Sequence, residues 1–317
     1  MTDPTKLLFG IDTSDFSRNA LGALGKFMAG NKAVHIQIFH GAPDLSVIGA
    51  KYPFFEPQPR EETLRRLNAE SKKCLEKAKN ALIEAGIDED SVSVVLKENC
   101  TDPAGAIQDL AEAEGSDSIG VARFGESTIG RHVIGSVTSR IASSSEKFPV
   151  WIVDHRVKAR HVLVCLVGAP IGERIMDHAA HHFSHLHDIR FTLFHVIPPV
   201  TLKADRLSQV LSKDAPEQEK KRVTESMTLQ LQLAEKALEE GKQKFLQYGI
   251  PEKNIHLKKQ AQEEGIARDI LTEMERGDNG ILVVGRKGSK EIQQYSLGSK
   301  AYKLLCTSRP FILCLVN

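Results

Sequence analysis

Short apolar runs alternate along the whole chain with segments that carry apolar residues at helical spacing. The runs are rich in Val, Ile and Leu and nearly continuous, which is typical of strands in a parallel sheet covered on both faces. Leu64, Leu67, Leu75 and Leu82 lie on one stripe of a long predicted helix. In the first half the pattern predicts strands over 7–12, 34–40, 91–97, 118–122 and 150–154, helices over 17–28, 61–85, 103–114 and 136–143, and an irregular Pro-rich stretch over 43–59.

The same pattern occurs twice, so the chain is a tandem repeat. Residues 6–12 align with residues 161–167, and further along Gly135-Ser136 aligns with Gly298-Ser299. The second copy has a longer first half and contains a long predicted helix over 217–248. We therefore expect two domains, residues 1–156 and residues 157–317, joined by a short charged linker.

Strand–helix alternation of this kind predicts an α/β fold with two doubly wound, mostly parallel five-stranded sheets and helices on both faces. Two such copies are expected to pack about a pseudo-twofold axis. The last strand of each copy is the natural meeting edge, because an exposed sheet edge needs cover. Ligands of such sheets bind at the carboxyl ends of the strands, so the residues that follow each strand are the candidates for a site.

A glycine pattern follows the fourth strand of both copies. Glycine lets a backbone approach a ligand closely, and Gly-Ser at the start of a helix presents amides and a hydroxyl to an anion. Tight turns also need glycine, but the pattern recurs at the same place in both copies, and this favours phosphate binding over a turn alone. The pattern consists of Ala122, Gly125, Gly135 and Ser136 in the first copy and of Gly285, Gly288, Gly298 and Ser299 in the second.

This spacing, Gly-x2-Gly-x9-Gly-Ser after the fourth strand, resembles the universal stress protein family, and the resemblance extends over both copies. Asp12 and the strand ends 38–40 and 193–195 add to it. The resemblance implies sheets of strand order 3-2-1-4-5. It also implies ATP or a related adenine nucleotide, with or without Mg²⁺, as the ligand of one branch of the family, whereas another branch lacks the glycines and does not bind.

The resemblance assigns a set of site residues to each copy. It implies that the first-strand Asp and the backbone after the second strand hold the adenosine, and that the glycines and the following Ser hold the phosphates. In the first copy the set is Asp12, Gly41, Ala122, Gly125, Gly135, Ser136 and Val137, and in the second it is Val196, Gly285, Gly288, Gly298 and Ser299.

Each copy departs from the family pattern at one end of the site. Ala122 replaces the first glycine of the first copy, and Val167 stands where Asp12 does, so the second copy lacks the carboxylate. We expect the first copy to be the more complete site. Asp12 can also be an ordinary turn or capping acid, since Thr13 and Ser14 follow it.

The charge balance and the cysteines indicate which partners and which cellular compartment to expect. Lys and Arg total 42 against 41 Asp and Glu, so charge gives no reason to expect a nucleic acid or membrane partner. The chain begins without a signal-peptide pattern and has no apolar run of membrane-spanning length. Its five cysteines show no metal-finger spacing and are expected to be buried thiols. A cytoplasmic protein is expected, with a nucleotide as its small-molecule partner and a homodimer of tandem chains as one option.

The catalytic motifs of common enzymes are missing from the sequence. It contains no GxxxxGK[ST], HExxH, GxSxG or GxGxxG, so we expect a nucleotide-binding regulator with at most slow ATP hydrolysis. The alternatives are a weak ATPase and an interaction scaffold with degenerate pockets. His178, His182 and His185 lie one turn apart and could bind a metal, but a solvated polar helix face is the expected reading, and no metal or catalytic residue is assigned.

Overall fold

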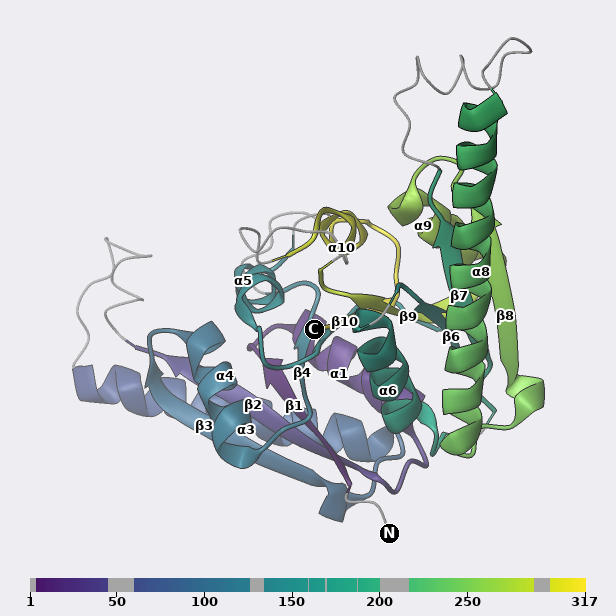
Figure 1. Ribbon diagram of the computed structural model, residues 1–317. Coiled ribbons are helices and arrows are strands. Elements are labelled where there is room, and N and C mark those ends of the chain that lie inside the picture. Colours follow the sequence, from purple (N-terminus) through teal and green to yellow (C-terminus); the bar gives the residue numbers. More distant parts are fainter. Residues whose placement is uncertain are drawn as a thin grey trace.

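The structure is a computed structural model in which one mixed sheet, covered by helices on both faces, runs through the whole molecule (Figure 1). It describes residues 4–44, 60–125, 134–158, 160–168, 170–186, 188–199, 217–287 and 297–317. Most of the Pro-rich stretch predicted over 43–59 lies outside these residues.

The first half contains the strands and helices that the sequence pattern predicts, with ends shifted by a few residues. Its elements are β1 (Thr5–Ile11), α1 (Asp15–Met28), β2 (Val34–Pro43), α3 (Arg60–Glu84), the 3₁₀ turn η1 (Glu89–Ser91), β3 (Val92–Cys100), α4 (Pro103–Glu114), β4 (Ser118–Ala122), α5 (Ser136–Ser144) and β5 (Val150–Val153).

The second half repeats this succession of elements. They are β6 (His161–Cys165), α6 (Ile171–Phe183), β7 (Phe191–Ile197), α8 (Glu217–Gln247), η2 (Glu252–Asn254), β8 (Ile255–Ala261), α9 (Ile266–Arg276), β9 (Asn279–Gly285), α10 (Ser299–Leu305) and β10 (Ile312–Val316).

Helix α4 illustrates how local sequence sets the boundaries. The Asp102 carboxylate accepts a hydrogen bond from the Gly105 amide (3.1 Å), and Pro103 occupies the first helical position, where a missing N–H has no cost. The helix ends at Gly115, whose φ of 64° is left-handed and suits glycine. The helix therefore starts just after the carboxyl end of β3 and ends just before the start of β4.

The two predicted sheets join into one. The strand order is β3-β2-β1-β4-β5-β10-β9-β6-β7-β8, which is 3-2-1-4-5 in each half. Neighbours within each half are parallel, whereas β5 and β10 pair antiparallel, with Val153 opposite Ile312 and Val150 opposite Leu315. We call this β5–β10 junction the seam; it brings together the last strands of the two halves, as predicted, and leaves neither as a free edge.

Each face of the sheet carries its own continuous core. Side chains alternate along β5, so Trp151 and Val153 belong to the core beneath α1, α3, α6 and α8, whereas Val150 and Ile152 belong to the core beneath α4, α5, α9 and α10. Both cores cross the seam, and strands buried on both sides account for the nearly unbroken apolar runs in the sequence.

Two buried arginines, one from each copy, link the halves on the second face. Arg123 Nη1 donates to the carbonyls of Thr307 and Arg309, both at 2.9 Å, and its guanidinium lies 4.9 Å from the centroid of the Phe311 ring. Arg286, the repeat equivalent, donates to the Ile141 carbonyl. Burial lowers the pKa of each arginine to about 10, so both remain charged at neutral pH.

The histidines of α6 also lie against the first half, and the expectation of a solvated face is wrong for two of them. His178 and His182 are buried. Trp151 Nε1 donates to His178 Nε2 (3.1 Å), and Ser118 Oγ lies 3.3 Å from His182 Nε2. His185 alone is exposed. The sequence pattern missed this burial because α6 contacts its own core on one side and β5 of the other half on another.

Four of the five cysteines are buried and one is exposed. Cys74, Cys100, Cys165 and Cys314 are buried free thiols as expected, but Cys306 is exposed after α10, so the expectation fails for that residue. Among the described helices, none combines the length and the apolar character needed to cross a membrane.

The buried histidines predict an acid-sensitive fold. Burial, together with the charges of neighbouring histidines, holds the pKa of His178 well below its usual value, and it lowers the pKa of His182 to about 3. Between about pH 6.5, where unfolded histidine titrates, and about pH 3, unfolding takes up protons that the native state excludes. The free energy of unfolding should therefore fall with acid by up to about 1.4 kcal/mol per pH unit for each of the two.

The measurement is urea unfolding followed by circular dichroism between pH 7 and pH 4. Replacing both residues by the non-titrating glutamine, in His178→Gln/His182→Gln, should flatten the slope of stability against pH. The matched change His185→Gln, two residues after the end of α6 and exposed, should leave that slope as it is. Equal slopes in the double variant and the wild type would contradict the assignment.

Candidate nucleotide site

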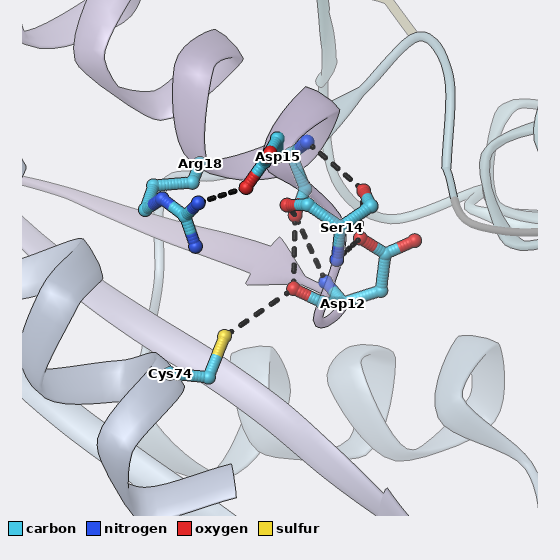
Figure 2. A network of polar contacts seen from close by, with 6 residues as sticks. Asp12, Ser14, Asp15, Arg18 and Cys74 are labelled. Atoms are coloured by element: carbon cyan, nitrogen blue, oxygen red, sulfur yellow. Dashed lines mark hydrogen bonds and ion pairs between the residues drawn. The ribbon is translucent and has the colours of Figure 1, made fainter. Parts of the chain in front are cut away.

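The turn between β1 and α1 fixes Asp12 at the carboxyl edge of the sheet (Figure 2). Asp12 Oδ1 accepts hydrogen bonds from the amide (3.0 Å) and the hydroxyl of Ser14. Ser14 is the N-cap of α1 and accepts from the Ser17 amide, while Ser17 Oγ donates to the Asp12 carbonyl (3.0 Å). Asp12 is thus a turn acid, and its second oxygen, Oδ2, faces Gly125, where a Cβ atom would lie 2.5 Å from it.

His40 ties the ends of β1 and β2 to α3. Its Nδ1 donates to the Ile11 carbonyl (2.9 Å), and its Nε2 lies 3.2 Å from Ser71 Oγ. The ring is buried, and both nitrogens are engaged. These contacts give His40 a structural role.

Gly41 follows His40 and lacks a side chain for a packing reason. A Cβ atom at Gly41 would lie 2.8 Å from Cys100 Sγ on β3. Glycine is therefore required by the neighbouring strand, and it also leaves the backbone of β2 open to the cavity described below.

Two hydrogen bonds join the end of β4 to the start of α5 beside the glycine pattern. The Gly135 amide donates to the Arg123 carbonyl (3.1 Å), and Thr138 Oγ1 donates to the Ala122 carbonyl (2.6 Å). Gly135 is the N-cap of α5 with φ of −57°, an ordinary conformation for any residue. The first residues of α5, Ser136 and Val137, are exposed at the mouth of the site, where the helix N-terminus carries partial positive charge.

One cavity of about 130 Å³ brings together all seven residues predicted for the first copy. These residues are Asp12, Gly41, Ala122, Gly125, Gly135, Ser136 and Val137. The rest of the lining is mostly apolar and consists of Gly10, Ile11, Ser17, Phe39, His40, Pro103, Ile107, Val121, Phe124 and Thr138. The sequence reading missed the wall from α4, Pro103 and Ile107, although a helix that begins at the carboxyl edge is a signal for it.

The lining carries few ionisable groups. Asp12 and His40 are the titratable side chains among the described lining residues, and no lysine or arginine is present there. An anion in this cavity would therefore contact backbone amides, hydroxyls and the α5 N-terminus. Among the described residues, no group of three His, Cys, Asp or Glu side chains is placed to hold a metal ion.

The corresponding turn of the second copy has lost its polar network. Val167, Ala169 and Gly172 occupy the positions of Asp12, Ser14 and Ser17. The backbone carbonyl of Val167 lies so close to Gly172 that no Cβ atom fits there.

Gly298 of the second copy repeats the backbone contact that Gly135 makes in the first. The Gly298 amide donates to the Arg286 carbonyl (2.9 Å), as Gly135 does to Arg123, and Ser299 begins α10. A Cβ atom at Gly285, however, would lie 2.9 Å from Cγ2 of Ile171, a side chain of α6. Val196 is buried near the end of β7. Gly288 lies outside the described residues.

Fold and site together define a tandem α/β protein with a ligand cavity at the carboxyl edge of its first half. The Universal stress protein family model matches residues 4–154. Residues 4–154 therefore form a domain of this family, and the second half of the chain repeats the strand order of the first.

Solved structures share the fold over the whole chain. A universal stress protein from Archaeoglobus fulgidus aligns over 99% of this chain and 96% of its own, with 18% identity and a TM-score of 0.60. A putative universal stress protein from Pseudomonas aeruginosa aligns over 99% of this chain and 94% of its own, with 16% identity and a TM-score of 0.54. A universal stress protein in complex with cAMP aligns with 49% of this chain and 99% of its own, with 21% identity and a TM-score of 0.32. No curated protein matches the chain.

The geometry of Gly135 predicts a variant that closes the cavity and leaves the fold intact. The nearest atom to a Cβ at this position, Thr138 Oγ1, is 3.4 Å away, which is ordinary contact, and φ is not left-handed. Gly135→Val should therefore lower the affinity for ATP by at least about tenfold, because the side chain occupies the ligand space, while Tm changes by no more than about 4 °C.

Isothermal titration calorimetry and thermal unfolding give the two readouts. Gly168→Val, at an exposed glycine of the second half with no atom near its Cβ position, is the control and should bind as the wild type does. Undiminished ATP affinity in Gly135→Val would remove Gly135 from the site.

Proposed function

We propose that the first half binds an adenine nucleotide, ATP or a related one, and that the chain acts as a stress-response regulator whose state depends on that ligand. The observation that supports this most directly is the convergence of the seven predicted residues on one cavity. Family membership over residues 4–154 adds to it.

The residues of the cavity suit the parts of a nucleotide. Asp12 Oδ2 can accept a hydrogen bond from an amine or a ribose hydroxyl, and the backbone at Gly41 lies beside it in the same lining. Phe39, Pro103 and Ile107 provide an apolar wall for a base. The enclosed volume is below the range of about 300–1,000 Å³ that is usual for whole-ligand pockets, so the phosphates would extend over the start of α5.

The phosphates would be held mainly by neutral donors. The Ser136 hydroxyl and the N-terminus of α5, both at the mouth of the cavity, are suited to an anion. Since no basic side chain of the described residues lines the cavity, a bound Mg²⁺ would supply the charge compensation, and ATP affinity should depend on it.

We infer one nucleotide per chain. The second copy keeps its glycine pattern, but Ile171 lies against Gly285 and Val167 replaces the carboxylate, so its residues suit packing better than binding. We further propose that residues 1–156 and 157–317 are the two domains, that the protein is cytoplasmic and that two tandem chains can form a homodimer.

The hydrogen bonds of His40 favour a regulatory role over hydrolysis of the nucleotide. His40 is the only side chain of the described cavity lining, apart from Asp12, that could act as a base, and both of its ring nitrogens are already engaged. Asp12 is oriented by Ser14. Both candidate bases are thus held by contacts within the protein, so hydrolysis of a bound nucleotide would be slow.

Nucleotide released from the purified protein tests this proposal. Denaturation followed by ion-exchange chromatography should recover close to one equivalent of adenine nucleotide, or the emptied protein should bind one equivalent of ATP with Mg²⁺. Protein that releases no nucleotide and gives no titration signal would instead support the interaction scaffold. Sustained phosphate release over many turnovers would support the ATPase.

A further inference from the structure

A second and larger cavity lies away from the nucleotide site, between α1, α3 and the segment after β5. It measures about 1070 Å³. Helices α1 and α3 cover the same face of the sheet, and Ile312 of β10 contributes at the seam. We call this cavity the linker groove, because residues 155–158 and Arg160 of the linker form one of its walls.

The linker groove is strongly basic. Six Lys and Arg side chains and His155 line it against a single carboxylate, Glu84, whereas the whole chain has a net charge of only +1. The six are Arg18, Lys26, Lys77, Arg156, Lys158 and Arg160. Like charges gathered in a cleft repel one another and concentrate counter-ions there, so the arrangement is most stable with an anion bound.

Three of these six cationic side chains already bond to other groups of the protein. Arg156 donates to both oxygens of the buried Asp154, Arg18 pairs with Asp15, and Arg160 donates to the Phe27 carbonyl. The Arg160 bond to Phe27, with the His155 ring edge-on to Phe16 at 5.5 Å, holds the linker against α1. The wall of the groove is therefore built by specific contacts.

The remaining cations are available to a ligand. Lys26, Lys77 and Lys158 are exposed, and none forms an ion pair with any residue that the structure describes. They come from α1, α3 and the linker respectively, so they surround the groove from three sides.

The helix surfaces between these cations carry almost no side-chain volume. Gly22, Ala23, Ala81 and Ala85 form this part of the lining, and no atom lies within 4 Å of a Cβ position at Gly22. Close packing of the two helices at Gly25, where a Cβ atom would lie 2.9 Å from Leu82 and from Ala85, keeps them fixed. The groove is thus open between its basic walls.

We propose that the linker groove binds a small molecule that carries several phosphate groups. Arg and Lys are the side chains that pair best with phosphate oxygens, and three unpaired ammonium groups on separate elements suit an extended polyanion better than a single one. The volume is that of a whole-ligand pocket. This site is separate from the nucleotide cavity, with which it shares no lining residue.

The test uses sodium tripolyphosphate as the probe and the Gly135→Val chain as the background, so that the nucleotide cavity is closed. Calorimetry should detect saturable binding of one equivalent. Lys26→Glu/Lys77→Glu should weaken it by at least about tenfold, because two phosphate contacts become repulsive. Lys32→Glu/Lys72→Glu changes the net charge equally at exposed residues that do not line the groove, and it should alter the affinity by less than about twofold.

Three results would overturn the proposal. They are a lack of saturable tripolyphosphate binding, equal weakening by both charge-reversal pairs, and tighter binding of a glutamate peptide with the same number of charges. Nucleotide recovered from Lys26→Glu/Lys77→Glu in the otherwise wild-type chain reports separately on the first site and should equal that of the wild type.

Discussion

The antiparallel pairing of β5 with β10 is the constraint on which the rest of the structure depends. Each half alone would end in a fully apolar strand with unpaired backbone groups along one edge, which is a site for aggregation. Pairing the two edges satisfies those groups and makes both cores continuous across the molecule. It also explains why Arg123 donates to carbonyls after α10 and why His178 and His182 are buried against β5 and its neighbour β4.

The two copies share one backbone hydrogen bond beside the glycine pattern but differ in the residues around it. In both, the amide of the last motif glycine, Gly135 or Gly298, donates to the carbonyl of a buried arginine. In the first copy a cavity lies beside the polar turn around Asp12, whereas in the second Ile171 lies against Gly285. The sequence difference lies in the turn after the first strand, where Val167 stands in place of Asp12, whereas the glycine spacing is the same in both copies.

Most of the fold could be predicted from the sequence because its signals are local. Apolar runs, the Asp102-Pro103 helix start and the repeat predicted the elements, and the family resemblance assigned the seven residues that line one cavity. The errors concern contacts between distant segments. The burial of His178 depends on Trp151 of the other half, and the α4 wall of the cavity depends on the sheet order. A helical pattern reports which face of a helix is apolar but cannot report a second surface that covers its polar residues.

The position of β10 has a consequence for synthesis of the protein on the ribosome. Although β1 to β5 are complete once residue 153 has emerged, the strand that covers the edge of β5 is formed by residues 312–316. Throughout the intervening elongation the nascent first half presents an unpaired strand to its surroundings. Its natural partner is still unmade, so the same edge of a neighbouring nascent chain can pair with it first, and this makes exchange of strands between chains the characteristic misfolding route of a tandem architecture.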